Sequence, residues 1–137
     1  MAVLLDASMV LAAADRADLN HGAAVAWFAR VDEPLLLGAL SLADLDHVLQ
    51  RELGMSASVA LVSTIVNGSI RLVAPTDVDL ARAAELMTQA AEDRPRLVDA
   101  VLVATAERLA VRRVATFDRR PIAVFRPRHV RSLDLEP

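Results

Sequence analysis

The chain has 137 residues, 55% of them hydrophobic but only 3% aromatic, so we expect one domain spanning residues 1–137 with a core of Leu, Val and Ala. The absence of cysteine excludes disulfides, thiolate metal sites and cysteine nucleophiles. The net charge of −3 excludes a uniformly basic protein, and no apolar stretch approaches the roughly 18 residues of a membrane span or the pattern of a signal peptide. We therefore expect a cytoplasmic protein without membrane contact.

The first third of the chain predicts two strands and three helices. The apolar run at residues 2–5 stops at Asp6 and is typical of a strand that is buried on both faces. Residues 8–14 predict a helix, and Asn20 caps a second one that ends before Pro34. Residues 35–37 predict another strand. Ser41 is expected to cap a helix that runs to Leu53 and stops at Gly54.

The remainder of the chain continues this alternation. A helix from Ser56 to about residue 67 precedes a strand at 70–73, and Thr76 with Asp79 approximates a capping box for a helix at 80–91. Residues 97–109 are apolar nearly all round, which predicts a buried helix. A strand at 113–117, a loop at 121–127 and a last short strand at 130–133 follow. Short strands alternating with helices indicate an α/β, three-layer sandwich with a mainly parallel sheet.

Three aspartates fall where a parallel sheet would gather them. Asp6 and Asp118 each follow an apolar strand, and ligands of open α/β sheets bind at the carboxyl ends of the strands. Asp99 lies in the first turn of the buried helix. Each residue alone has an ordinary explanation, since a carboxylate in the first turn satisfies free N–H groups and the helix dipole. Together they predict a site for a hard cation such as Mg²⁺ or Mn²⁺, which can activate water for phosphodiester hydrolysis.

The basic residues are all arginine, and eight of them fall in residues 108–131, where the only acid is Asp118. Arginine suits bidentate contact with phosphate, although a solvated surface explains such a cluster equally well. Arg112, Arg119 and Arg120 are the candidate phosphate contacts of this segment.

Four motifs, in order along the chain, carry a resemblance to a known family. They are L-D-A-S at residues 5–8, A-D-L-D-H-V-L followed by R-E-L-G at 43–54, D-A-V-L-V-A-T-A-E-R-L at 99–109, and A-T-F-D-R-R at 115–120. A trailing F-R-P-R-H follows at 125–129. With these motifs the sequence resembles PIN-domain ribonucleases of the VapC toxin type, and the likeness spans nearly the whole chain.

The resemblance implies a PIN-like α/β/α sandwich that acts as a metal-dependent endoribonuclease, the toxin of a toxin–antitoxin pair. It implies catalytic roles for Asp6, Asp44, Asp99 and Asp118, with Mg²⁺ or Mn²⁺ held by the first, third and fourth of these residues. Ser8 and Thr116 would support the carboxylates or metal-bound water. The implied partners are RNA, a VapB-type antitoxin whose C-terminal segment covers the acidic crevice, and a second copy in a homodimer. With RNA as the substrate, we expect Arg112, Arg119 and Arg120 to bind it.

Two other interpretations remain open. A PIN-like module that binds RNA or protein with weak or no cleavage is permitted by the departure at Asp44, where the family usually has glutamate. A phosphate-handling domain of the receiver or dehalogenase type also places aspartates at strand ends. The receiver type needs a lysine, which the chain lacks, and the dehalogenase motif needs an acid at Ser8.

The departure at Asp44 generates a prediction. Aspartate is one methylene shorter than glutamate, so its carboxylate reaches about 1.5 Å less far. Asp44→Glu should therefore raise the rate of RNA cleavage, measured with purified protein and Mg²⁺ or Mn²⁺. An unchanged or lower rate would show that the shorter side chain does not limit the reaction. The neighbouring Asp46 lies on the opposite border of the helix's apolar stripe, and helical periodicity alone does not choose between the two.

Overall fold

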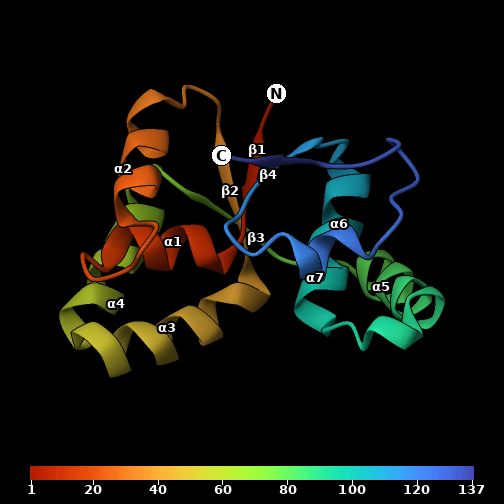
Figure 1. Cartoon of the computed structure of the whole chain (residues 1–137), viewed down its shortest axis with the longest axis horizontal. Helices are drawn as coiled ribbons and strands as arrows, with labels where there is room; N and C mark the ends of the chain where they lie inside the picture. The colour runs from red at the N-terminus through yellow and green to blue at the C-terminus, as the bar shows by residue number, and fades with distance from the viewer.

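A five-stranded sheet, parallel throughout, forms the centre of the computed structural model, which describes residues 1–137 (Figure 1). The strand order is β3-β2-β1-β4-β5. The strands are β1 (Val3–Leu5), β2 (Leu35–Gly38), β3 (Arg71–Val73), β4 (Arg113–Ala115) and β5 (Asp134–Glu136). The predicted α/β class with a parallel sheet is confirmed.

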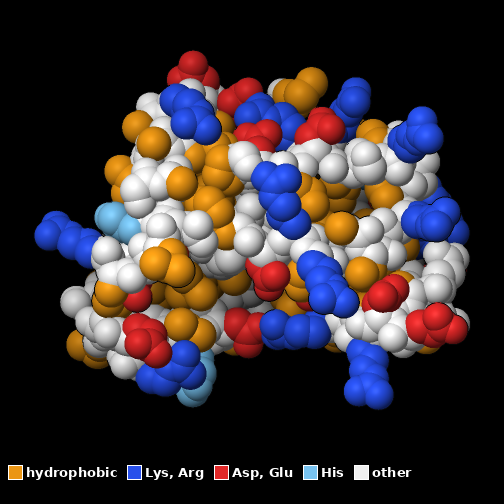
Figure 2. Space-filling view, in the orientation of Figure 1, with side chains coloured by type: hydrophobic (Ala, Val, Ile, Leu, Met, Phe, Trp, Pro, Cys, Tyr) orange, Lys and Arg blue, Asp and Glu red, His pale blue; other side chains and the backbone are white.

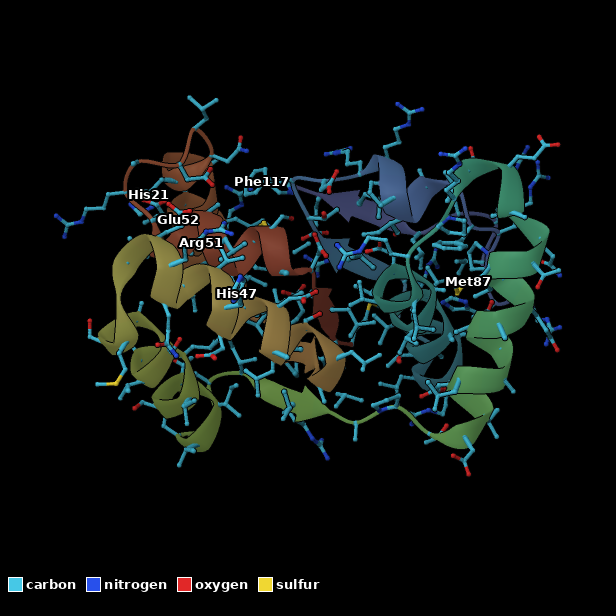
Figure 3. All side chains as sticks on the ribbon, turned by 90° about the horizontal axis from the view of Figure 1, so that it is seen from below. His21, His47, Arg51, Glu52, Met87 and Phe117 are labelled. Atoms are coloured by element: carbon cyan, nitrogen blue, oxygen red, sulfur yellow. The ribbon has the colours of Figure 1, made fainter.

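Helices cover both faces of the sheet and make the outer two layers of the sandwich (Figures 1 and 3). The first four helices lie on one face, whereas α5 and α6 lie on the other. The helices are α1 (Ala7–Ala14), α2 (His21–Arg30), α3 (Ala39–Leu53), α4 (Met55–Val66), α5 (Asp77–Gln89), α6 (Leu97–Leu109) and α7 (Arg120–Ala123), and a 3₁₀ turn η1 (Ala91–Asp93) precedes α6.

The core consists of two apolar clusters, one on each face of the sheet. Because successive strand residues point to opposite faces, Val3 and Leu5 join the cluster under α1 to α4, whereas Leu4 joins the cluster under α5 and α6. All three residues are buried. The continuous apolar run that predicted a doubly buried strand thus describes the central strand of the sheet.

The strand order reverses beside β1. From β1 the chain proceeds through β2 and β3 toward one edge, and then crosses to β4 and β5 on the other side. Leu5 of β1 is level with Ala115 of β4, so both strands end together. A crevice at the carboxyl ends of strands where the order reverses is the general position of ligand sites in open α/β sheets.

Most predicted helices agree with the structure. The range of α6 matches the prediction, and Thr76 and Asp79 form the expected capping box, with both reciprocal hydrogen bonds present. The expected cap at Ser41 is wrong, because α3 already begins at Ala39 with Gly38 before it. Ser41 therefore lies inside the first turn, where it is buried.

The C-terminal segment departs furthest from the prediction. The predicted strand at 130–133 is wrong, since pairing begins only at Asp134, whose N–H donates to the carbonyl of Arg112. Side chains fix this register: Arg113 hydrogen-bonds both carboxylate oxygens of Glu136, and Trp27 donates to the same carboxylate. Part of the expected loop at 121–127 is the helical turn α7, in which Pro121 occupies a position that tolerates proline.

None of the helices combines the length and the apolar character needed to cross a membrane.

Candidate acidic site at the switch point

Asp6 is held in place by hydroxyl groups from two neighbouring strand ends. It follows β1 and caps α1, accepting from the Ser8 N–H at 3.3 Å and from Ser8 Oγ at 2.5 Å. Thr116 Oγ1, which follows β4, donates to the same carboxylate oxygen, Oδ2, at 2.8 Å. All three groups donate to Oδ2, so Oδ1 receives no hydrogen bond from the protein and stays available to a ligand.

The hydroxyls that hold Asp6 also shape the turn that carries Asp118. Ser8 Oγ accepts the N–H of Phe117 at 3.0 Å, and Thr116 Oγ1 accepts the N–H of Asp118 at 2.9 Å. Because these backbone groups bond to side chains, β4 ends at Ala115 rather than at the predicted residue 117. The exposed Asp118 is thereby tied to the same two hydroxyls that fix Asp6.

Asp99 approaches the same edge from the first turn of α6 and is only 8% exposed. Burial and, after it, the nearby charges of Asp6 and Asp118 raise the pKa of Asp99 to about 6, while Arg96 opposes the shift. The first helical turn was expected to stabilise this carboxylate. Instead, its charged form is disfavoured, because it lies among other carboxylates and no hydrogen bond compensates it.

These residues fit a hard divalent cation by their chemistry. The donors are carboxylate and hydroxyl oxygens, the class that Mg²⁺ and Mn²⁺ prefer. The mutual repulsion of Asp6, Asp99 and Asp118 is the charge that such an ion would neutralise. As the side chains stand, no three acidic or histidine groups lie close enough together to form a complete ligand cage. Waters or substrate oxygens would have to complete the coordination, as is usual for Mg²⁺.

Asp44 faces the acidic edge, whereas Asp46 does not. Asp44 Oδ2 accepts from Arg96 Nη2 at 3.1 Å, across the gap between α3 and the start of α6. Asp46 accepts from Gln50 on its own helix, and its backbone carbonyl lies 3.5 Å from Ser58 Oγ of α4. The structure therefore distinguishes Asp44 from Asp46, which helical periodicity alone did not. Asp44 is the residue near the acidic edge, but its carboxylate is paired with the Arg96 guanidinium.

The arginine-rich segment at 108–131 serves largely to hold the fold together. Arg108 pairs with buried Asp79 at 2.9 Å, and Arg128 pairs with Glu85 at 3.0 Å. Arg113 pairs with Glu33 and Glu136. The acids come from distant parts of the sequence, which is why the segment looked uncompensated.

The three arginines expected to bind RNA lie in different places. Arg112 precedes β4 and so lies at the amino ends of the strands, the edge opposite the acids, which argues against RNA contact beside them. Arg119 and Arg120 follow Asp118 at the acidic edge, and Arg119 Nη2 donates to the carbonyl of Pro137. Figure 2 shows acidic side chains near the centre of this face with arginine side chains beside and below them.

The histidines contribute nothing to the acidic edge. His21 and His129 ring nitrogens contact the carbonyls of Ala12 and Val111. His47 is exposed on α3, where it is labelled in Figure 3 together with Arg51 and Glu52.

Removing one hydroxyl tests the hydrogen-bonded frame of Asp6. Thr116 is completely buried, so Thr116→Val keeps the shape but loses the bonds to Asp6 Oδ2 and from the Asp118 N–H. We expect the free energy of unfolding to fall by about 1–3 kcal/mol in urea titrations. Thr116→Ser retains the hydroxyl and should recover part of that loss; equal stability of the Val variant and the parent would contradict the assignment.

The raised pKa of Asp99 makes stability depend on pH. The folded chain binds this proton more tightly than the unfolded chain, so the stabilising proton is present at low pH and is lost between pH 3.8 and about 6. Without metal, Asp99→Asn should raise the thermal unfolding temperature by several degrees at pH 7.5 and change it little at pH 4. The matched control is exposed Asp93→Asn. A rise of the same size at both pH values would exclude the charge as its cause.

Comparison with known proteins identifies the family of this chain and its relatives. Residues 3–126 match the PIN domain family. Ribonuclease VapC26 of Mycobacterium tuberculosis is 26% identical over 125 residues, covering 91% of this chain and 93% of the relative.

Solved structures share the architecture. VapC20 of Mycobacterium tuberculosis, described as a sarcin-ricin loop cleaving toxin, has a TM-score of 0.82 and 23% identity over 94% of this chain and 98% of its own. FitAcB from Neisseria gonorrhoeae has a TM-score of 0.71 and 17% identity over 98% of this chain and 96% of its own. VapBC2 from Rickettsia felis, bound to a promoter DNA fragment, has a TM-score of 0.70 and 12% identity over 99% and 98%. The VapC-type resemblance of the motifs is confirmed, and the chain belongs to the PIN-domain family.

Proposed function

We propose that this protein is a metal-dependent endoribonuclease and the toxin of a type II, VapBC-like toxin–antitoxin module. The observation that carries the proposal is the set of three mutually repelling carboxylates at the switch point, of which Asp6 keeps one oxygen free of hydrogen bonds. The similarity to a ribonuclease over 91% of the chain supports the same activity.

Asp6, Asp99 and Asp118 would hold Mg²⁺ or Mn²⁺, and Ser8 and Thr116 keep the first of them oriented. The chemistry supplied by such an ion, when bound, is activation of water and neutralisation of the leaving oxygen. The protein's own part is to hold the acids in a partly buried edge, where Coulomb interactions are stronger than in water. Arg119 and Arg120 lie beside Asp118, and we assign them to the RNA backbone, because phosphate contacts position a nucleic acid without reading its sequence.

A VapB-type antitoxin is the partner we assign. An apolar groove of about 550 Å³ runs between α1, α2 and α4 on the face of the sheet that the first four helices cover, lined by residues such as Val10, Phe28 and Leu61. An apolar groove of this kind suits an amphipathic segment of another chain. The similarity to the structure named VapBC2 supports the assignment.

The homodimer remains a prediction, and the exposed stripe of Met55, Val59, Val62 and Val66 along α4 is the surface that supports it. Val59→Arg should then lower the mass measured by light scattering from that of a dimer to that of a monomer. The variant should remain folded, with a cooperative thermal unfolding transition. The matched control is Ser63→Arg, an exposed position of the same helix outside the stripe. A parent protein that is monomeric at micromolar concentration would contradict the prediction.

Cleavage of a mixed cellular RNA pool tests the proposed activity. We expect cutting with Mg²⁺ or Mn²⁺ that EDTA abolishes, and we expect Asp6→Asn and Asp99→Asn each to lower the rate by at least a hundredfold. Asp32→Asn, an exposed acid before β2 at the amino ends of the strands, serves as the matched control. Cleavage that persists in both variants, or in EDTA, would overturn the proposed site.

A second candidate is a PIN-like module that binds RNA or protein with little or no cleavage. The observation that favours it is the ion pair between Asp44 and Arg96, which engages the second family acid with a guanidinium. Folded protein that binds RNA but cuts none of the pool over a range of metal concentrations would favour this candidate over the nuclease.

A further inference from the structure

A hollow of about 360 Å³, which we call the arginine hollow, lies directly beside Asp99. Its wall combines two segments that are close only in space: the turn before α6, with Arg94 and Arg96, and the start of α7, with Arg120. Its volume lies within the roughly 300–1,000 Å³ of small-ligand pockets. The hollow therefore borders the acidic edge and extends it.

The three guanidinium groups of the hollow differ from the structural arginines of this protein. Arg94 and Arg120 form no ion pair, although Glu92 and Asp93 also line the hollow, and Arg96 pairs only with Asp44. By contrast, Arg82, Arg108, Arg113 and Arg128 each bind carboxylates that fix packed elements. Two free guanidinium groups, with a third held near them, provide donors for a ligand with several anionic oxygens.

The backbone and the ion pair both set the position of these groups. Arg94 has a left-handed conformation, with φ of 49°, which costs energy for a residue other than glycine and is often found at functional sites. Arg96 and Asp44 are 69% and 57% exposed, so their contact is too well solvated to contribute much stability. In the structure this contact directs the Arg96 side chain across the gap from α6 to α3.

We propose that the arginine hollow binds an RNA phosphate adjacent to the one that is cut, and that Asp44 is a positioning residue that orients Arg96 for this contact. The inference rests on the proposed ribonuclease function and adds a substrate subsite to it. Phosphate is the ligand that fits, because the guanidinium fork matches its oxygens. A chain of nucleotides whose scissile phosphate lies at Asp6, Asp99 and Asp118 passes the hollow on its way from the site.

Binding of a fluorescein-labelled, single-stranded RNA of mixed sequence, measured by anisotropy in EDTA, tests the subsite without cleavage. Arg96→Gln and Arg120→Gln should each weaken binding about tenfold, since a hydrogen bond between charged groups is lost. Each should also reduce the slope of log K against log salt by about 0.7, the value for one contact with single-stranded RNA. The matched control is Arg71→Gln, which removes an exposed arginine at the opposite edge of the sheet.

The role of Asp44 is tested by combining substitutions. Asp44→Asn should weaken RNA binding in the parent but have no further effect when Arg96→Gln is already present, whereas Asp44→Glu should retain binding. Additive effects of the two substitutions would overturn the positioning role. Binding equal to that of the parent in both Arg96→Gln and Arg120→Gln would overturn the subsite.

Cleavage kinetics separate this inference from the proposed function. With Mg²⁺ or Mn²⁺, Arg96→Gln and Arg120→Gln should raise KM more than they lower kcat. If the parent cuts RNA and both variants keep its KM, the subsite is wrong and the nuclease stands. If the parent cuts no RNA while Arg96→Gln still weakens RNA binding, the nuclease is wrong and the subsite belongs to a binding module.

Discussion

The arrangement of the site depends on electrostatic repulsion of Asp99 by Asp6 and Asp118. Two hydroxyls bind one oxygen of Asp6 and leave the other without a donor. The same hydroxyls hold the turn that carries Asp118, and the charges of Asp6 and Asp118 raise the pKa of the largely buried Asp99 on α6. A fold that aimed only at stability would pair or replace such charges. None of the three forms an ion pair with an arginine, and Arg96 offsets only part of the rise in the pKa of Asp99, which supports the proposed cation.

The arginines show the complementary arrangement. At the contact of α5 with α6 and at the C-terminal strand, arginines are matched with carboxylates. Burial raises the pKa of Glu107 and Glu136, but hydrogen bonds from Arg82 and Arg113 outweigh it and hold both pKa values below their usual range. Near the acidic edge, Arg94 and Arg120 have no such partner. Arginines that join packed elements are thus paired with acids, whereas Arg94 and Arg120 beside the acidic edge are not.

Much of this organisation could be predicted from the sequence. The apolar run before Asp6 predicted the central strand, and the all-round apolar pattern of residues 97–109 predicted α6, because periodicity and burial are local properties of a sequence. The register of β5 could not be predicted in this way, since it depends on Arg113 and Trp27 meeting Glu136 from more than 20 residues away. Short polar strands carry a weak local signal, and tertiary contacts decide them.

In the candidate site, too, some features could be predicted from the sequence and others depend on contacts between distant residues. The carboxyl ends of parallel strands predicted that Asp6 and Asp118 would share an edge, because that follows from topology. The pair of Asp44 with Arg96 spans 52 residues, and the run containing Arg94 and Arg96 indicated only a break between helices. Likewise, the position of Arg112 at the edge opposite the acids follows from the start of β4, a boundary that charge pattern does not reveal.

The titration of Asp99 tests directly whether Asp6, Asp99 and Asp118 form a cation site. Its carboxyl carbon can be followed by NMR in protein labelled with ¹³C-aspartate, with Asp99→Asn used for assignment. We expect the pKa of Asp99 to be about 6 without metal and to decrease markedly when Mg²⁺ is added, because the cation neutralises the neighbouring charges. A pKa near the ordinary 3.8 without metal, or one that Mg²⁺ leaves unchanged, would contradict the claim that these three carboxylates form an unfinished cation site.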